Sequence, residues 1–439
     1  MAGNNPLVEV FRIKELRDRI LYTLGWLVMF RVGAYLPIPG IDASALAAYF
    51  GSQTQGGGIT DYLDFFAGGA FKNFSLFMLT VMPYISAQII MQLLLVIFPS
   101  LKKIAEEDGG RKKIARWTRL GSIAVGLVQG LAVVSYARSI PGALIIDERL
   151  YTVVALITVT AGALFLVWIG EQITKRGIGN GVSLIIFAGI VARLPNGLFA
   201  LWQKIRSEEL NPVFAIVVLL MFGLVIALVV YEQQGQRKIP VTYAKRVVGR
   251  KMYGGQNTYI PFKINPSGVI PVIFASSLLS FPIQIASGLG PNVKWLRDFA
   301  AFMDPGKVWY WVFYVLMIVF FAYFYTQVSL NPQEISRNIR ENGGSIPGIR
   351  SEKMEEYLTK ILNRIILPGA LYLALIALIP TVVQRMFNFP AELSYLLGGT
   401  SLLILVGVDL DVMSQVEAQL KMHHSEGLVR KGHIRSRNL

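Results

Sequence analysis

Ten apolar stretches are distributed along this chain of 439 residues. Each is about 20 residues long, the length that an α-helix needs to cross the roughly 30 Å hydrocarbon core of a bilayer. Hydrophobic residues make up 54% of the chain and charged residues only 16%, whereas soluble domains carry about a quarter charged residues. The sequence therefore predicts an all-α polytopic membrane protein, with spans near residues 20–38, 74–98, 117–137, 151–172, 182–202, 212–231, 267–286, 308–328, 365–384 and 395–414.

The distribution of Lys and Arg predicts how these spans are oriented. With successive loops on alternating sides, the side of the N-terminus holds 31 of these residues and the other side holds ten, while Arg31 lies within the first span. Loops rich in Lys and Arg stay on the cytoplasmic side of a membrane. We therefore expect both termini to be cytoplasmic.

The spans also divide into two groups of five near residue 207. Because each half has an odd number of spans, two related halves would be inverted relative to each other, although we find no residue-level repeat. The predicted organisation is a cytoplasmic amphipathic segment at 1–19, an N-terminal half at 20–206, a C-terminal half at 207–414 and a cytoplasmic tail at 415–439.

An external segment at 39–73 contains an amphipathic stretch, residues 59–71, that is too short to span a bilayer. It predicts a short helix that ends at Gly68 and Gly69, since glycine is common just after a helix. So apolar a helix would be poorly solvated in water. It either folds back into a cavity of the protein or lies flat on the outer leaflet, and the pattern does not separate the two.

Two long cytoplasmic loops, 233–265 and 329–361, are predicted to project from the membrane. The first alternates β-branched and aromatic residues around a Gly pair, which is typical of a hairpin. The second contains a short helical pattern followed by a Gly-Gly-Ser turn and a Pro-Gly turn. Basic and aromatic residues are interleaved in the first loop, which favours docking of nucleic acid or an acidic protein surface over a purely topogenic role.

The sequence offers little for catalysis. It has no Cys, and its three His residues all lie within the last seventeen positions, so thiolate chemistry and a His base within the membrane are excluded. There is no Walker A motif, and the GIGNG segment at 177–181 is interpreted as a tight turn between helices. Asp409 and Asp411 leave an intramembrane aspartyl protease as a minor alternative, but they point to different faces of one helix.

A small-solute secondary transporter is the main alternative from a different class. Transporters usually place ionisable residues near the membrane midplane, whereas Arg31, Glu171 and Glu232 fall near the ends of spans. The centres of spans two and seven instead carry small or weakly polar residues. Two such helices in contact would part readily, which is a property of a gate.

Seven segments make the sequence resemble the SecY family, the channel subunits of the bacterial protein-conducting translocon, over essentially its whole length. None is specific by itself, but seven in order on ten spans are highly specific. They are FRVGAYLPIPGID (30–42), MPYISAQIIMQLL (82–94), GEQITKRGIGNGVSLIIFAGIV (170–191), YAKRVVGRKMYGGQNTYIPFKIN (243–265), GVIPVIFASS (268–277), SIPGIR (345–350) and GGTSLLILVGV (398–408).

The resemblance implies an hourglass channel between two inverted five-helix halves, with a re-entrant plug helix. Aliphatic side chains at its waist would offer an ion no replacement for its hydration shell, so such a ring would gate by dewetting. By composition alone these residues would be ordinary core aliphatics. Val81 stands where the family often has Ile, which makes the ring slightly smaller there. The predicted pore ring is Val81, Ile85, Ile186, Ile273 and Ile404.

The stretch 59–73 matches the family's plug, and we expect Asp61, Asp64 and Lys72 in it to remain hydrated. The lateral gate would lie between spans two and three on one side and spans seven and eight on the other. The predicted plug residues are Asp61, Tyr62, Leu63, Phe65, Phe66, Gly68 and Gly69, and the predicted gate residues are Ser86, Gln88, Gln92, Ser276 and Ser277.

The family also implies partners. We expect a non-enzymatic channel of the bacterial inner membrane that needs no cofactor or metal and acts with SecE and SecG. The SecA motor or the ribosome would dock on the two loops, signal sequences and preproteins would enter the channel, and anionic lipids would attract the basic loops. The predicted docking residues are Arg246, Arg250, Lys251, Arg337, Arg340 and Arg350.

Overall fold

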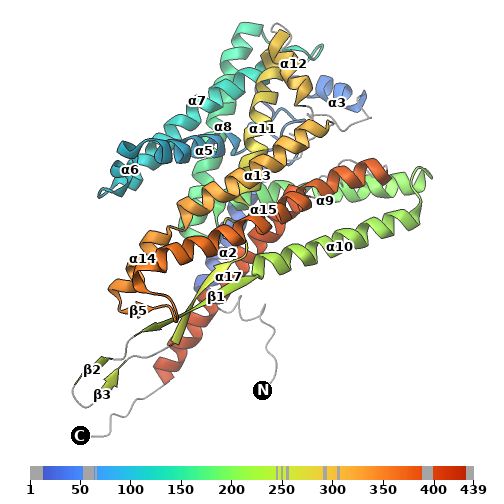
Figure 1. Cartoon of the computed structure of the whole chain (residues 1–439). Helices are drawn as coiled ribbons and strands as arrows, with labels where there is room; N and C mark the ends of the chain where they lie inside the picture. The colour runs from blue at the N-terminus through green and yellow to red at the C-terminus, as the bar shows by residue number, and fades with distance from the viewer. Residues whose placement is uncertain are drawn as a thin grey trace. The chain divides into compact units, whose positions relative to one another are not determined.

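A computed structural model describes residues 13–52, 64, 67–243, 246–248, 251–253, 257–289, 294–303, 307–387 and 399–431 (Figure 1). A helix coincides with each of the ten predicted spans. These helices are α2 (Lys14–Gly33), α5 (Met82–Ile97), α7 (Gly110–Arg138), α8 (Glu148–Arg176), α9 (Gly181–Arg206), α10 (Pro212–Gln234), α11 (Ile270–Leu289), α13 (Val308–Ser329), α15 (Met354–Phe387) and α17 (Gly399–Lys431).

Length and apolarity single out the clearest membrane spans. Within the described residues, six helical stretches are long and apolar enough to cross a bilayer, and a seventh is obtained if α5 is joined to α6 (Pro99–Glu106), which is bent from it by 105°. The bend falls at Phe98, which is extended and precedes Pro99. Proline disfavours helical backbone at the residue before it, so the break is dictated by the sequence.

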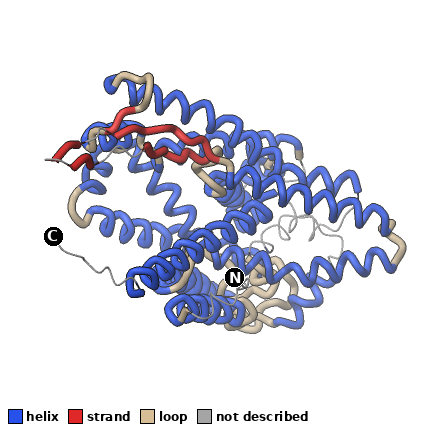
Figure 2. The backbone as a smooth tube through the Cα atoms, turned by 90° about the horizontal axis from the view of Figure 1, so that it is seen from below, coloured by secondary structure: helices blue, strands red, loops and turns tan. Residues whose placement is uncertain are grey.

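The chain forms two compact units. The first comprises Met1–Leu198, Gln284–Arg297 and Ile404–Leu439, and the second comprises Phe199–Ile283 and Asp298–Leu403. Among the described residues, all strands lie in the second unit, and most of the chain is helical (Figure 2). The four-part organisation that we derive from the sequence stays a prediction.

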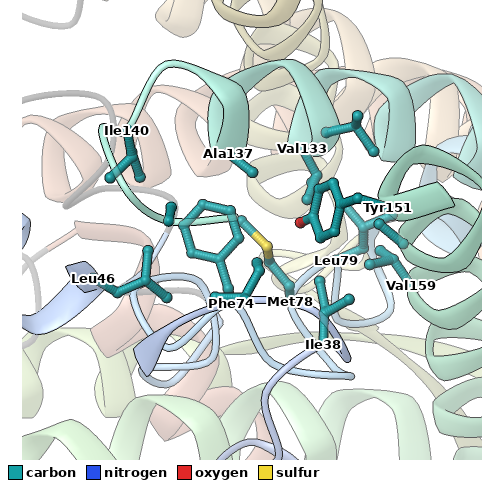
Figure 3. Close-up of a cluster of buried hydrophobic side chains, with 14 of the residues drawn as sticks. Ile38, Leu46, Phe74, Met78, Leu79, Val133, Ala137, Ile140, Tyr151 and Val159 are labelled. Atoms are coloured by element: carbon teal, nitrogen blue, oxygen red, sulfur yellow. The ribbon is translucent and has the colours of Figure 1, made fainter. Parts of the chain in front are cut away.

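The core of the first unit surrounds an irregular segment that runs into α5. Phe74, Met78 and Leu79 from this segment are buried against Val133 of α7 and Tyr151 of α8 (Figure 3). Backbone hydrogen bonds join the segment to the stretch after α2, from the Ile38 N–H to the Phe74 carbonyl at 2.8 Å and from the Leu76 N–H to the Leu36 carbonyl at 2.9 Å. The segment is therefore held by main-chain bonds and side-chain packing together.

The second predicted span begins later than the sequence indicates. We expect it from residue 74, but residues 67–81 form turns and α5 starts at Met82. Phe74 and Thr80 have φ angles of 43° and 52°, a left-handed conformation that cannot continue a right-handed helix. Pro83 in the first turn of α5 then suits a helix start.

Before this segment, a short helix lies in the predicted external stretch. This helix, α3 (Ala43–Ser52), follows Asp42, whose carboxylate accepts hydrogen bonds from the Ser44 hydroxyl at 2.5 Å and from the Ser44 backbone N–H at 2.8 Å. The same two bonds hold the pKa of the Asp42 carboxyl below its ordinary value, because they favour its charged form. Asp42 thus acts as a cap for the helix.

In the second unit, the two long loops meet in one sheet. Strand β1 (Gln236–Tyr243) pairs antiparallel with β4 (Asn257–Lys263) and with β5 (Gly344–Ser345), giving the order β4-β1-β5. The short strands β2 (Arg246–Val248) and β3 (Lys251–Tyr253) pair with each other. The second loop also contains α14 (Pro332–Glu341) and the 3-10 turn η2 (Ser351–Lys353). The antiparallel loop, the short helix and the Pro-Gly turn are therefore confirmed, but Gly344 and Ser345 of the predicted Gly-Gly-Ser turn form β5 because they pair with β1. The Gly pair of the predicted hairpin lies outside the described residues.

A buried cluster joins this sheet to the helices below it. Ile239 and Val241 of β1 and Phe262 of β4 pack with Ile339 of α14 and Leu358 of α15. The register places Ile239 opposite Ile260 and Val241 opposite Thr258. Ile239 and Val241 of β1 thus face the helices, and Pro240 between them is exposed on the other face.

Gly162 provides a direct test of packing in the first unit. A Cβ atom built at Gly162 would overlap the Leu76 backbone carbonyl, so α8 lies against the irregular segment without space for a side chain. We expect Gly162→Ala to lower the stability of the protein by about 1–3 kcal/mol, because overpacking against a backbone group cannot be relieved by a rotamer change. The midpoint of thermal unfolding in detergent measures this loss.

Gly25 of α2 offers the matched control, since nothing lies within 4 Å of a Cβ built there. We expect Gly25→Ala to leave stability unchanged or raise it by up to about 1 kcal/mol, the difference in helix propensity between the two residues. Equal midpoints for the two variants would contradict the packing of α8 against residue 76.

Candidate functional site

The predicted plug is only partly within the described residues. Asp61, Tyr62, Leu63, Phe65 and Phe66 lie outside them. Asp64 is helical, and Gly68 and Gly69 follow with φ angles of 60° and 95°, in agreement with a helix end at the glycine pair.

Asp64 and residues 67–74 pack inside the first unit. Ala67, Ala70 and Phe74 have exposed fractions of 2%, 0% and 0%. The interpretation of this stretch as a helix flat on the outer leaflet is therefore wrong for the described residues, and the cavity interpretation holds for them. The absence of a side chain at Gly68 allows its backbone to lie against α9, because a Cβ there would be only 2.7 Å from the Gly189 Cα.

The prediction that the Asp64 carboxylate is hydrated is wrong. Its side chain is only 1% exposed and forms an ion pair with Arg193 of α9. The same carboxylate accepts a hydrogen bond of 2.8 Å from the Lys72 backbone N–H. A carboxylate in an apolar site needs charged and hydrogen-bonding partners, and the fold supplies both.

A second arginine binds the same segment. The Arg31 guanidinium of α2 donates a 2.8 Å hydrogen bond to the Gly68 carbonyl and a 2.9 Å bond to the Tyr35 hydroxyl. Its Cζ lies 5.1 Å from the centre of the Tyr35 ring, a cation–π distance. Arg31 therefore has partners inside the protein and does not depend on reaching the membrane surface.

The predicted ring residues are apolar and mostly buried. Val81 caps the N-terminus of α5 with an exposed fraction of 0%, and Ile85 in the next turn is 4% exposed. Ile186 of α9 and Ile404 of α17 are also buried in the first unit, while Ile273 of α11 belongs to the second unit and is partly buried. Their assignment to one ring stays a prediction.

The predicted gate residues lie on two helices. Ser86, Gln88 and Gln92 are partly buried on α5 in the first unit. Ser276 and Ser277 are buried on α11 in the second unit. The Ser276 hydroxyl donates to the Ile273 carbonyl at 2.9 Å, so its polarity is partly satisfied within its own helix. Their role in a gate stays a prediction.

The glycine-rich GIGNG segment forms the tight turn that its position predicts. Gly179 has a φ of 81°, and a Cβ at Gly181 would overlap the Gly170 carbonyl of α8. The Gly179 N–H donates to the Gln415 side chain of α17 at 2.9 Å, and the Ile178 N–H donates to the Thr23 hydroxyl of α2 at 3.1 Å. This turn therefore packs three helices together and makes no phosphate loop.

The predicted docking residues lie on the two loops. Arg337 and Arg340 are exposed on α14, and Arg350 is exposed directly before η2. Arg246 and Lys251 lie in β2 and β3, but their side chains, and all of Arg250, fall outside the described part of the chain. Lys238 lies over the Tyr259 ring at 4.7 Å. The surface thus combines exposed cations with aromatic faces.

Pairing of β5 with β1 joins the two loops. Thr242 and Ser345 face each other, and the Thr242 hydroxyl donates to the Ser345 carbonyl at 3.2 Å. Position 344 requires glycine, which has no Cβ, because a Cβ there would lie only 2.9 Å from atoms of Ile339 and Tyr243. The two loops are consequently joined by one sheet, β4-β1-β5.

Acidic residues form no reactive centre in the part of the chain that the structure describes. No group of three or more His, Cys, Asp or Glu residues there could hold a metal ion. Asp409 and Asp411 are exposed on α17, and Gln415 donates to Asp411 at 3.4 Å. Glu171 is paired with Arg119 of α7 through two hydrogen bonds of 2.9 and 2.7 Å. Asp409 and Asp411 are thus exposed and not enclosed as a catalytic pair, so they give the protease alternative no support.

Comparison with known proteins settles the family. The SecY family model matches residues 75–413. The protein translocase subunit SecY of Borreliella burgdorferi is 48% identical over 416 residues, covering 94% of this chain and 95% of that relative. The chain belongs to the SecY family. It is thus a multi-pass membrane protein and a channel subunit rather than an enzyme, as the sequence predicts.

Solved structures agree on the fold of this SecY-family chain. A protein-conducting channel superposes with a TM-score of 0.64 at 19% identity, covering 92% of each chain. Sec61 in the canine ribosome–channel complex from the endoplasmic reticulum superposes with a TM-score of 0.60 at 18% identity, again covering 92% of each chain. The ten-helix, all-α membrane fold that the sequence predicts for this chain is confirmed.

Two residues of this SecY-family site are missed by the sequence reasoning. Arg193 and Arg31 both bind the segment that starts at Asp64. Arg193 lies outside the seven family segments, and Arg31 lies in the first of them without a role predicted for it. A signal was present, because a charged residue within an apolar stretch needs a partner. Asp64 and Arg193 carry opposite charges in two such stretches, but their pairing depends on a fold that brings positions 129 residues apart into contact.

Proposed function

We propose that this chain is the pore-forming subunit of the bacterial general secretory translocon, conducting unfolded preproteins across the inner membrane. The observation that carries the proposal is the family match over almost the whole chain. SecA or the ribosome supplies the driving force. The absence of a Walker A motif from the sequence supports an external source of energy.

Val81, Ile85, Ile186, Ile273 and Ile404 form the constriction of the channel. All five are aliphatic, and the four in the first unit are buried. Such residues give an ion no ligands, so a narrow ring of them stays dry. They make no sequence-specific hydrogen bonds, so an extended polypeptide of any sequence can displace them.

Residues 59–73 seal the external side when the channel is idle. The burial of Ala67, Ala70 and Phe74 in the first unit supports a closed position for this plug. Ser86, Gln88, Gln92, Ser276 and Ser277 line a lateral gate. An apolar segment of about 20 residues leaves through it into lipid, and a polar segment continues across the membrane.

The joined loops form the docking surface for SecA and for the ribosome. Arg246, Arg250, Lys251, Arg337, Arg340 and Arg350 carry its positive charge. The ribosome complex of the canine homologue supports the second partner, and contacts to rRNA phosphates would weaken steeply with salt. SecE and SecG complete the assembly, and signal sequences enter the gate. Both termini are cytoplasmic, and anionic lipids bind at that face of the membrane.

Reconstitution tests the function directly. Vesicles that contain this chain with SecE and SecG should take up a preprotein only when SecA and ATP are added. Protection of the preprotein from added protease measures uptake, and vesicles without this chain provide the control. Solute accumulation without SecA, combined with no preprotein uptake, would overturn the proposal and favour a transporter.

A further inference from the structure

The contact between Asp64 and Arg193 has features that ordinary packing does not require. Both charged groups are largely removed from solvent, with side-chain exposures of 1% for Asp64 and 17% for Arg193. The carboxylate is also fixed by the Lys72 N–H, and the Gly69 N–H donates to the Asp64 carbonyl at 3.1 Å. The residue is therefore held both through its charge and through its backbone.

Arg193 also lies close to the turn that follows. A Cβ built at Gly69 would lie 3.6 Å from the Arg193 guanidinium carbon, and the φ of Gly69 is 95°. Gly68 lies against the backbone of Gly189, one turn before Arg193 on the same helix. Asp64, Gly68 and Gly69 thus all contact α9, and two of these contacts are made with Arg193.

We propose that the Asp64–Arg193 pair is an electrostatic latch that holds the plug segment closed against α9. The inference rests on the proposed function, because it gives the segment the role of a seal. Neither charge can leave the other until water or another partner replaces it, since an unpaired charge in an apolar site is strongly unfavourable. Release of the segment is therefore coupled to entry of water.

Arg31 makes a different kind of attachment. It binds the Gly68 carbonyl, a neutral group, so its loss removes a hydrogen bond but leaves no buried charge behind. Removal of Arg193 leaves the Asp64 carboxylate without its counter-charge. The two arginines hold neighbouring points of one segment, but only Arg193 makes closure depend on a pair of opposite charges.

Two measurements test the latch, ion leak through idle channels in vesicles and labelling of a buried cysteine. The chain has no Cys, and Ala70 is fully buried in the segment, so Ala70→Cys reports exposure of the plug by its rate of reaction with a membrane-impermeant maleimide. We expect Arg193→Gln and Asp64→Asn each to raise both the leak and the labelling rate at least about tenfold, with the larger effect for Arg193→Gln.

The charge swap, Asp64→Arg with Arg193→Asp, separates a latch from simple loss of packing. We expect it to bring both rates back to within about threefold of the parent, because the pair is restored with reversed polarity. Arg138→Gln serves as the control, since Arg138 pairs with Glu148 at 2.8 Å at an exposed site of the same unit, and exposed pairs contribute little. It should change neither rate.

The outcomes distinguish the latch from the proposed function. If the single variants leave the leak and the labelling at the parent level, or if the swap is as leaky as the singles, the latch is wrong even when SecA-driven export proceeds normally. If the parent vesicles show no export at all, the proposed function fails, and the labelling experiment still reports whether the ion pair holds the segment.

Discussion

Replacement of Arg350 by Glu is expected to reduce SecA-driven export into vesicles at least about tenfold, a loss typical for a charge-reversed contact at a docking surface. Arg350 is exposed and sits at the start of η2, where its carbonyl accepts a 2.9 Å bond from the Lys353 N–H. That bond holds the backbone at Arg350, and the exposed side chain is accessible to a partner. The SecA ATPase rate stimulated by preprotein and the amount of protected preprotein measure the effect.

Lys353→Glu is the matched control for this variant. It reverses an exposed charge three residues away, within η2, and changes the net charge of the loop by the same amount. If only the overall electrostatic field of the loop matters, export will be equally impaired in the two variants. If Arg350 makes a specific contact, export in Lys353→Glu will stay within about threefold of the parent. Normal export and normal ATPase stimulation in Arg350→Glu would remove Arg350 from the motor site.

The combined change Ile85→Gly, Ile186→Gly and Ile404→Gly is expected to raise the ion conductance of the idle channel at least about tenfold. Removal of three aliphatic side chains leaves room for a continuous column of water, and an apolar constriction excludes ions only while it stays dry. Single-channel recording in planar bilayers measures the conductance. The variant should still export preproteins, because the ring makes no specific bonds to them.

These substitutions also destabilise the protein, so the control variant must also lose a buried aliphatic side chain. Ile89 lies on α5 one turn beyond Ile85 and is 2% exposed. Ile89→Gly removes a buried side chain at a cost of about 2–5 kcal/mol and adds the helix penalty of glycine, yet it leaves the predicted ring complete. A similar leak in Ile89→Gly would attribute the conductance to loosened packing and not to the ring.

Much of this architecture follows from local patterns. The apolar stretches mark the helices because bilayer thickness fixes their length. The loop at 233–265 forms a hairpin since its alternating residues present one apolar face, with Ile239 and Val241 buried. Gly179 and Gly181 mark a tight turn because their positions admit no side chain.

Other features depend on distant contacts. Phe74 and Thr80 adopt positive φ angles, which apolar and β-branched residues rarely do, and tertiary packing overrides their helical preference. Strand β5 has only two residues and forms because β1 offers it a free edge. The local sequence predicts a solvated carboxylate at Asp64, because its partner Arg193 is distant in the chain. In each case the decisive partner lies far away in the sequence, where periodicity carries no information.

The pairing of β5 with β1 has a mechanical side. Thr242 and Ser345 tie the loops 233–265 and 329–361 together, and Met354 and Leu358 at the start of α15 lie in the same cluster as Ile239. A force applied to β1 would therefore be passed to β5 and to the start of α15, because the three are hydrogen-bonded or packed together. If a partner docks on either loop, as we propose, it acts on the first turn of a helix that enters the bilayer.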